Sequence, residues 1–162
     1  WPLYEGFFST LGMKLVLVNE VCKEGTKKTA SSFCFPAEIS HGMFNSLLKA
    51  KTDYIFMPHV AELYVENSCW EGGVEHHSTC VLAQSEPFYV RSAFRQKKEK
   101  IITPYLNFAK GWDCMADKFV EIGDEFGFDA HEAREAYRVG VLKIKEFNKK
   151  KDTVNNSLTS LN

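Results

Sequence analysis

The sequence predicts an α/β fold, namely a Rossmann-like or flavodoxin-like three-layer domain with a short, mostly parallel sheet and a long C-terminal helix. Helical and strand-like segments alternate along the chain at the spacing of βαβ units. The expected strands are short, continuous apolar runs without polar alternation, as in a parallel sheet that is covered on both faces. With 162 residues, the chain is long enough to bury a hydrophobic core. We therefore expect a single α/β domain over residues 1–151.

The first half of the chain is expected to hold two main helices and a first strand. Residues 3–11 place apolar side chains on one helical face, and Gly12 follows as a C-cap. Residues 14–18 (KLVLV) are apolar and predict a short strand. The polar stretch 19–28 predicts a loop with at most one helical turn, and residues 37–51 return to a helical period.

Two further strands and one helix are expected in the middle of the chain. Residues 54–57 (YIFM) predict a buried strand that Pro58 closes. A helical pattern covers residues 80–94, although Pro87 must kink or restart it. Residues 101–103 predict the last strand, which ends before a proline.

The sequence pattern of the C-terminal part predicts two helices. Residues 112–126 are amphipathic, and Gly127 ends that helix. Asp129 then begins the last helix, with Glu132 three residues later to complete a capping box. Residues 152–162 lose apolar density and predict a disordered tail or the stub of a linker.

Composition argues against several classes of partner. Twenty Lys and Arg residues balance 21 Asp and Glu residues, so the chain lacks the field that attracts nucleic acid or an anionic membrane. No apolar run is long enough to cross a bilayer and no signal-peptide pattern is present, so we expect a cytoplasmic protein. Five cysteines without a secretion signal favour reduced thiols or metal ligands over a disulfide framework.

The beginning of the chain predicts that it was cut from a longer polypeptide. It starts at Trp1 without an initiator methionine. Three strands are also few for a doubly wound sheet. We therefore expect a first strand upstream of Trp1.

The stretch 31–42 (SSFCFPAEISHG) is the first candidate site. Ser31 or Ser32 is expected as the N-cap of a helix, and Pro36 suits its first turn. Cys34 then lies at the start of that helix, where the partial positive charge stabilises a thiolate. This placement favours metal ligation or reactivity, but the thiol is equally compatible with an inert apolar plug.

A second cysteine, Cys80, also precedes a predicted helix. It follows a long loop over residues 59–79, and loops of that length in compact domains are usually functional or disordered. Because ligands bind at the carboxyl ends of strands in open α/β sheets, Cys34 and Cys80 are candidates to converge there and to share one metal centre, although their spacing is too wide to be a signature by itself. The alternative is that both are buried structural thiols.

His41 and Gly42 follow Cys34 by about two helical turns. His41 is compatible with holding a carboxylate or phosphate, and also with a hydrogen-bonded packing role. Glu38, three residues earlier, is a candidate to orient the imidazole or a simple surface carboxylate. We interpret Pro36, His41 and Gly42 as positioning residues.

Another Cys/His set lies in the long loop. Cys69, His76, His77 and Cys80 are compatible with a zinc site, although they lack tight CxxC pairs. No GxGxxG, GxxxxGK[ST] or GxSxG motif is present, so no directly bound nucleotide and no catalytic residue is expected in this chain.

Several blocks of the chain together resemble a known family. These are WPLYEGFFSTLGMKLVLV, CFPAEISHG, LLKAKTDYIFMPHV, TCVLAQSEPFYVRSAF and KIITPYLNF. They are similar to the uncharacterised domain found in large multidomain activators of 2-hydroxyacyl-CoA dehydratases, such as 2-hydroxyglutaryl-CoA dehydratase. The resemblance covers about residues 1–150. It departs from the family pattern at Glu38, where Lys is common, and at Val81, where a proline usually follows the cysteine.

The resemblance implies a set of cofactor ligands. The domain is similar to dehydratase subunits and double-cubane proteins, which hold 4Fe–4S clusters by cysteines on loops between α/β segments. On that likeness Cys34 and Cys80 are the expected cluster ligands. Because a cubane normally needs three or four ligands, Cys69, Cys114 or another domain would complete the set.

The resemblance also implies a function and partners. We expect a domain that assists ATP-driven, low-potential electron transfer, beside the ATPase and dehydratase-like domains or subunits of its parent protein. Alone it would have no turnover. The alternatives are a metal-free structural or docking module of the same protein and a zinc-dependent hydrolase that uses the 69–80 loop.

Overall fold

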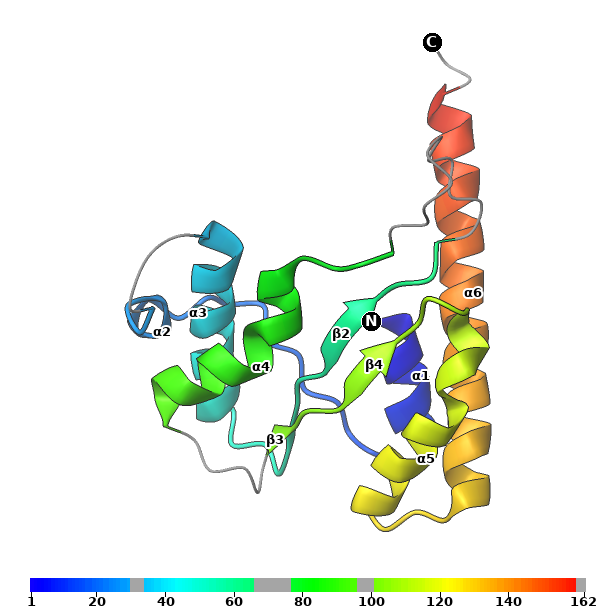
Figure 1. The fold of residues 1–162 in the computed structure, drawn as a ribbon, viewed down its shortest axis with the longest axis horizontal. Helices are drawn as coiled ribbons and strands as arrows, with labels where there is room; N and C mark the ends of the chain where they lie inside the picture. Colours follow the sequence, from blue (N-terminus) through cyan, green and yellow to red (C-terminus); the bar gives the residue numbers. More distant parts are fainter. Residues whose placement is uncertain (30–33, 66–76, 96–100, 160–162) are drawn as a thin grey trace. The chain divides into compact units, whose positions relative to one another are not determined.

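Figure 1 shows a computed structural model of the chain, which describes residues 1–29, 34–65, 77–95 and 101–159. The fold is mixed α/β, with short parallel two-stranded sheets and a long C-terminal helix, as the sequence predicts. The chain forms two compact units. The helical unit joins Trp1–Leu15 to Trp112–Asn162, and the mixed unit is Val16–Gly111.

The helical unit is built from α1 (Pro2–Thr10), the 3-10 helix η2 (Trp112–Met115), α5 (Ala116–Glu125) and α6 (Ala130–Thr159). Helix α6 packs against both α1 and α5. Among the described residues, no helix is long and apolar enough to cross a membrane.

Aromatic side chains form the core of the helical unit. Phe7 and Phe119 are fully buried, and their rings meet edge to face with centroids 4.8 Å apart. The Tyr137 ring lies 4.4 Å from that of Phe119, and its hydroxyl donates a hydrogen bond to the Trp112 carbonyl. These contacts bury large apolar surfaces and leave no polar end of Tyr137 unsatisfied.

Helices α1 and α6 cross at two glycines. A Cβ atom on Gly140 would lie 2.5 Å from the Leu3 carbonyl oxygen, and one on Gly6 would lie 2.6 Å from the Gly140 Cα. Real Cβ atoms do not approach backbone this closely. The two backbones therefore touch only because both positions lack a side chain.

The start of α6 follows the sequence prediction closely. Asp129 Oδ1 accepts hydrogen bonds from the backbone N–H groups of His131 and Glu132, at 2.8 and 2.9 Å. Glu132 Oε2 accepts from the Asp129 N–H at 3.1 Å, which completes the predicted capping box. Gly127, at φ +83°, ends the preceding segment in the left-handed region that glycine favours.

In the mixed unit, helices α2 (Lys23–Thr26), α3 (Phe35–Lys49) and α4 (Val81–Phe94) accompany four short strands. Helix α3 packs against both α2 and α4. A core cluster of Phe44, Val90 and two strand isoleucines lies among these elements.

The four strands that the structure describes form two parallel pairs. Strand β1 (Ile55–Phe56) pairs with β3 (Ile101–Ile102), and β2 (His59–Glu62) pairs with β4 (Tyr105–Asn107). The chain therefore remains extended past Pro58, where the sequence analysis ended a strand. Hydrogen bonds from Met57 N to Ile102 O (2.9 Å) and from His59 N to Pro104 O (2.8 Å) join the two pairs. Proline at 58 and 104 interrupts the ladder because it lacks an N–H group.

The strand predicted at residues 14–18 was wrong for this structure. These residues have no regular secondary structure, and the Leu17 side chain is 58% exposed. A strand needs a neighbour for its backbone groups. The described strands pair with one another, and none of them pairs with residues 14–18.

Two details of the helices also differ from expectation. The N-cap of α3 is Cys34, and the expected Ser31 and Ser32 lie outside the described residues. Pro87 lies within α4, which continues through it. The Ala83 carbonyl loses its helical hydrogen bond there, but Ala83 is exposed and water can replace it.

Helix α6 passes the domain boundary predicted at residue 151 and reaches Thr159. A favourable i,i+4 ion pair joins Glu146 to Lys150 at 2.7 Å. The Thr153 hydroxyl donates to the Lys149 carbonyl at 2.9 Å. Local helical contacts thus extend into the tail predicted over residues 152–162, of which 160–162 lie outside the described residues.

We expect Gly140→Ala to destabilise the protein by about 1–3 kcal/mol, because overpacking outweighs the better helix propensity of alanine, worth about 1 kcal/mol. Urea denaturation followed by circular dichroism measures the change. Leu142→Ala is the matched control. Leu142 lies about half a helical turn after Gly140 on α6, and its side chain is 58% exposed. Equal stabilities of Gly140→Ala and the wild type would contradict the close crossing.

Candidate functional site

The two cysteines predicted as ligands occupy equivalent positions on two helices. Cys34 is the N-cap of α3 and Cys80 is the N-cap of α4. Neither side chain makes a capping hydrogen bond. Cys34 is partly buried and Cys80 is exposed, and both are free thiols. Each sulfur is thus carried at the start of a helix, where the partial charge of the helix is positive.

Helices α3 and α4 are held together by aromatic packing. The His41 imidazole of α3 stacks on the Tyr89 ring of α4, with centroids 5.3 Å apart and planes within 16°. Further along, Phe44 meets Phe94 at 5.2 Å. These contacts fix the relative position of the two helices, and so of the two cysteines that precede them.

The charges of both cysteines affect the pKa of the Tyr89 phenol. Burial is the main cause that raises its pKa. The negative charges of Glu86, Cys34 and Cys80 raise the pKa further, since they oppose formation of a phenolate, whereas the Ser40 hydroxyl lowers it. The charges of Cys34 and Cys80 therefore act on the same tyrosine, although a helix and two strands separate the two cysteines in the sequence.

His41 has a packing environment. Its side chain is only 4% exposed, and Nδ1 lies 2.7 Å from the Ala37 carbonyl oxygen. Because a carbonyl oxygen only accepts, Nδ1 carries the proton in this contact. A buried ring with one nitrogen already used is poorly placed to hold a carboxylate or phosphate from solution.

Gly42 faces a different neighbour from His41. A Cβ atom at Gly42 would lie 2.4 Å from Val21 Cγ1 and 3.0 Å from Thr26 Cγ2. The Gly42 carbonyl also accepts a 3.3 Å hydrogen bond from the Cys22 N–H. The glycine therefore allows the turn that contains α2 to lie directly on α3.

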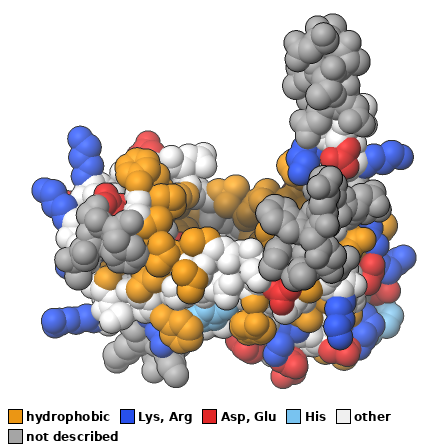
Figure 2. Space-filling model, turned by 45° about the horizontal axis from the view of Figure 1, so that its top comes forward, with side chains coloured by type: hydrophobic (Ala, Val, Ile, Leu, Met, Phe, Trp, Pro, Cys, Tyr) orange, Lys and Arg blue, Asp and Glu red, His pale blue; other side chains and the backbone are white. Residues whose placement is uncertain are grey.

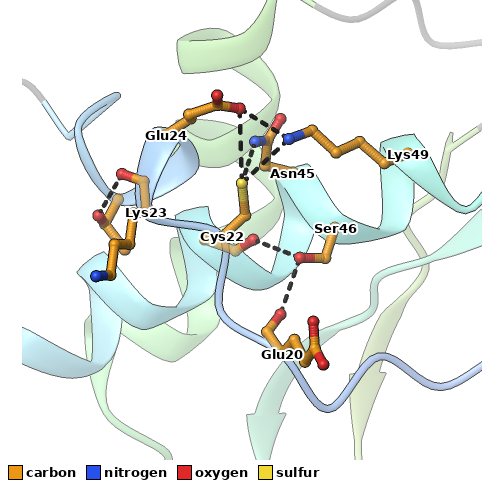
Figure 3. Close-up of polar contacts among 9 residues, drawn as sticks. Glu20, Cys22, Lys23, Glu24, Asn45, Ser46 and Lys49 are labelled. Carbon is orange, nitrogen blue, oxygen red and sulfur yellow. Dashed lines mark hydrogen bonds and ion pairs between the residues drawn. The ribbon is translucent and has the colours of Figure 1, made fainter.

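This turn carries Cys22, which the sequence analysis did not select as a site. Figure 3 shows its sulfur beside polar side chains of α3: Asn45 Nδ2 donates to Sγ at 2.9 Å, and Lys49 Nζ donates at 3.4 Å. Lys49 also pairs with Glu24 at 2.7 Å. The available sequence signal was weak, since only the i,i+4 spacing of Asn45 and Lys49 places both on one helical face.

The remaining predicted ligands lie elsewhere. Cys69 and His76 fall outside the described residues, so the zinc set stays a prediction. His77 is buried, and its carbonyl accepts from the Leu63 N–H at 2.9 Å. Cys114 is exposed and belongs to the helical unit. Within the described parts of the chain, no group of three or more His, Cys, Asp or Glu residues is arranged to hold a metal ion.

Apolar side chains are exposed beside both cysteines. Phe35, next to Cys34, is 72% exposed, and Val81, next to Cys80, is 71% exposed. Phe88, on α4, is 64% exposed. Hydrophobic side chains are visible among the charged groups on the face that Figure 2 displays. We call Phe35, Val81 and Phe88 the apolar rim.

The fold and the cysteine placement define this chain as a mixed α/β domain in which two cysteines, Cys34 and Cys80, each precede a helix. The family model described as "CoA enzyme activase uncharacterised domain" matches residues 1–161. The chain belongs to this family, which confirms the resemblance found in the sequence. No curated protein and no solved structure gives a significant match to the chain.

Replacing Cys80 by serine is expected to lower the pKa of Tyr89, because a negative charge that opposes the phenolate is removed. The effect is measurable by NMR titration of the tyrosine ring carbons in carbon-13 labelled protein. Cys114→Ser is the control, and should lower the pKa of Tyr137, which the charge of Cys114 raises. An unchanged Tyr89 titration in Cys80→Ser would show that the two groups do not interact.

Proposed function

We propose that this CoA enzyme activase-related domain assists ATP-driven, low-potential electron transfer by holding or docking a 4Fe–4S cluster at Cys34 and Cys80. The acceptor would be a partner of the 2-hydroxyacyl-CoA dehydratase type. One observation carries the proposal: both cysteines begin helices that pack on each other, and the charges of both act on Tyr89. A cluster supplies one-electron transfer at low potential when bound.

The two thiols fit part of a cluster site. Thiolates are the ligands that iron–sulfur clusters use, and helix starts stabilise them in the charged form. A cubane needs three or four such ligands, so the set is completed from outside this pair. Cys69 is one candidate for the third ligand, Cys114 is another, and a cysteine of a neighbouring domain is the remaining one.

The apolar rim supports docking of a partner at the same place. Phe35 and Val81 directly follow the two cysteines, and both are more than two-thirds exposed. A partner that covers them would gain about 25 cal/mol for each Å² of apolar surface removed from water. It would also keep water away from the thiolates, and solvent access is one of the factors that set the potential of a cluster.

We further propose that the two strand pairs belong to a larger Rossmann-like, three-layer sheet in the parent protein. Parallel sheets are normally covered on both faces and rarely consist of two strands. In such a sheet Cys34 and Cys80 would both lie at the carboxyl edge.

Other residues of this chain position the helices that carry the two cysteines. Pro36 sets the first turn of α3, and His41 holds α3 against α4. ATP hydrolysis would belong to an ATPase domain of the parent protein, and we assign no catalytic residue here. Reduced thiols of this kind suit a cytoplasmic location.

Anaerobic reconstitution with iron and sulfide tests the proposal. We expect the visible absorption and the electron paramagnetic resonance signal of a 4Fe–4S cluster in the full-length parent polypeptide, and their loss in Cys34→Ser and in Cys80→Ser. Cys22→Ser is the matched control and should keep the cluster, because Cys22 contacts Asn45 and Lys49 toward the other end of α3.

Two outcomes would overturn the cluster assignment. One is the absence of a stable cluster in both this chain and the full-length polypeptide. The other is a cluster that survives both serine substitutions. Either result would favour a metal-free docking module, in which Cys34 and Cys80 serve as structural thiols beside the apolar rim.

A further inference from the structure

Cys22 forms a polar cluster of its own, separate from the proposed cluster ligands. Its sulfur contacts Asn45 and Lys49, which lie in the second half of α3. At a rise of 1.5 Å per residue, Cys34 and Asn45 are about 16 Å apart along the helix axis. Cys22 is therefore too far from Cys34 to serve as a third ligand of the same cubane.

Hydrogen-bond donors converge on the Cys22 sulfur from two helices. Asn45 Nδ2 lies at 2.9 Å and Lys49 Nζ at 3.4 Å (Figure 3). Together with the backbone N–H groups of Gly25, the largest cause, and of Glu24, these contacts lower the pKa of the Cys22 thiol, and desolvation opposes them. Each of these donors stabilises the thiolate more than the neutral thiol.

One charged group near the sulfur, the Lys49 ammonium, favours the Cys22 thiolate, and another, the Glu24 carboxylate, opposes it. The Glu24 carboxylate and the Cys22 sulfur hold Lys49 in its charged form, since both raise the pKa of Lys49. Glu24 Oε2 lies 3.8 Å from Sγ and accepts from the neutral thiol. Lys49 and Lys27 lower the pKa of Glu24, so this carboxylate is ionised at neutral pH. An ammonium group therefore remains next to the sulfur across the physiological range.

The turn that carries Cys22 is held in place by backbone contacts. Gly25 approaches α3 so closely that a Cβ atom would lie 2.6 Å from the His41 carbonyl oxygen. On the other side of the sulfur, the Ser46 hydroxyl donates to the Glu20 carbonyl at 2.8 Å. Cys22 is thus a partly exposed thiol in a defined setting that contains an ammonium group, an amide donor and one carboxylate. Reactive cysteines are typically found beside cationic groups of this kind.

We propose that Cys22 is a modification site at which a peroxide oxidises the thiolate to a sulfenic acid. The sulfur attacks one peroxide oxygen and forms an S–O bond while the O–O bond breaks. With hydrogen peroxide the leaving hydroxide takes a proton from the buffer and departs as water, so that sulfur loses two electrons and the peroxide gains them. Lys49 and Asn45 stabilise the attacking thiolate.

The balance of two effects decides the expected rate. Each unit by which a thiol pKa falls raises the thiolate fraction about tenfold at pH values below that pKa, but lowers the nucleophilicity of the thiolate only about threefold. The gain in thiolate fraction therefore prevails. Among the other described cysteines, Cys114 is also exposed and provides a reference within the same chain.

The test follows peroxide oxidation of the full chain at pH 7, with dimedone trapping of sulfenic acid and mass spectrometry of the separate cysteine peptides. We expect Cys22 to be labelled faster than Cys114, because the contacts of Asn45 and Lys49 stabilise its thiolate. Lys49→Met keeps much of the side-chain length but removes the charge, and should slow Cys22 by about threefold, the scale of an exposed ion pair. Lys49→Arg should restore the rate.

Lys145→Met is the matched control. It removes an exposed lysine that pairs with Asp113 at 2.8 Å in the helical unit, and should leave the Cys22 rate unchanged. Asn45→Asp is a nearly isosteric second variant that places a negative charge beside the sulfur, and should also slow oxidation. Equal labelling rates for Cys22 and Cys114, or an unchanged Cys22 rate in both Lys49→Met and Asn45→Asp, would overturn the proposal.

Discussion

The packing of α3 on α4 is the contact on which the candidate site depends. Cys34 and Cys80 are the residues immediately before these helices, so any change in the helix pair moves both sulfurs. The contact is made by the His41–Tyr89 stack and by the Phe44–Phe94 pair. Aromatic pairs of this kind have preferred geometries and add about 0.5–1.5 kcal/mol each beyond the burial of their surface. The interface is therefore both stabilising and geometrically specific.

Helix α3 organises the mixed unit because successive residues face different neighbours. His41 turns toward α4 and supports the paired cysteines, whereas Gly42 turns toward α2 and supports the Cys22 cluster. The adjacent histidine and glycine of the CFPAEISHG block thus contact two different helices. Neither residue needs to touch a ligand for its replacement to disturb one of them.

Local patterns explain why the helices could be predicted and why much of the site could not. The capping box at Asp129, the turn at Gly127 and Pro36 in the first turn of α3 act within a few residues, so the sequence reveals them directly. The strand expected at residues 14–18 depends on a distant neighbour, and apolar composition alone could not supply it. Cys22 illustrates the same limit, since Lys49 reaches its sulfur across 27 positions of the chain.

The central claim is that Cys34 and Cys80 belong to one thiolate site. A variant with serine at Cys22, Cys69 and Cys114 retains these two cysteines alone, and one equivalent of cadmium tests whether they act together, because soft thiolates bind such metals. Alkylation followed by intact-mass spectrometry should then find chains with both thiols protected or both labelled. A population labelled at a single cysteine, or no protection by cadmium, would contradict the account.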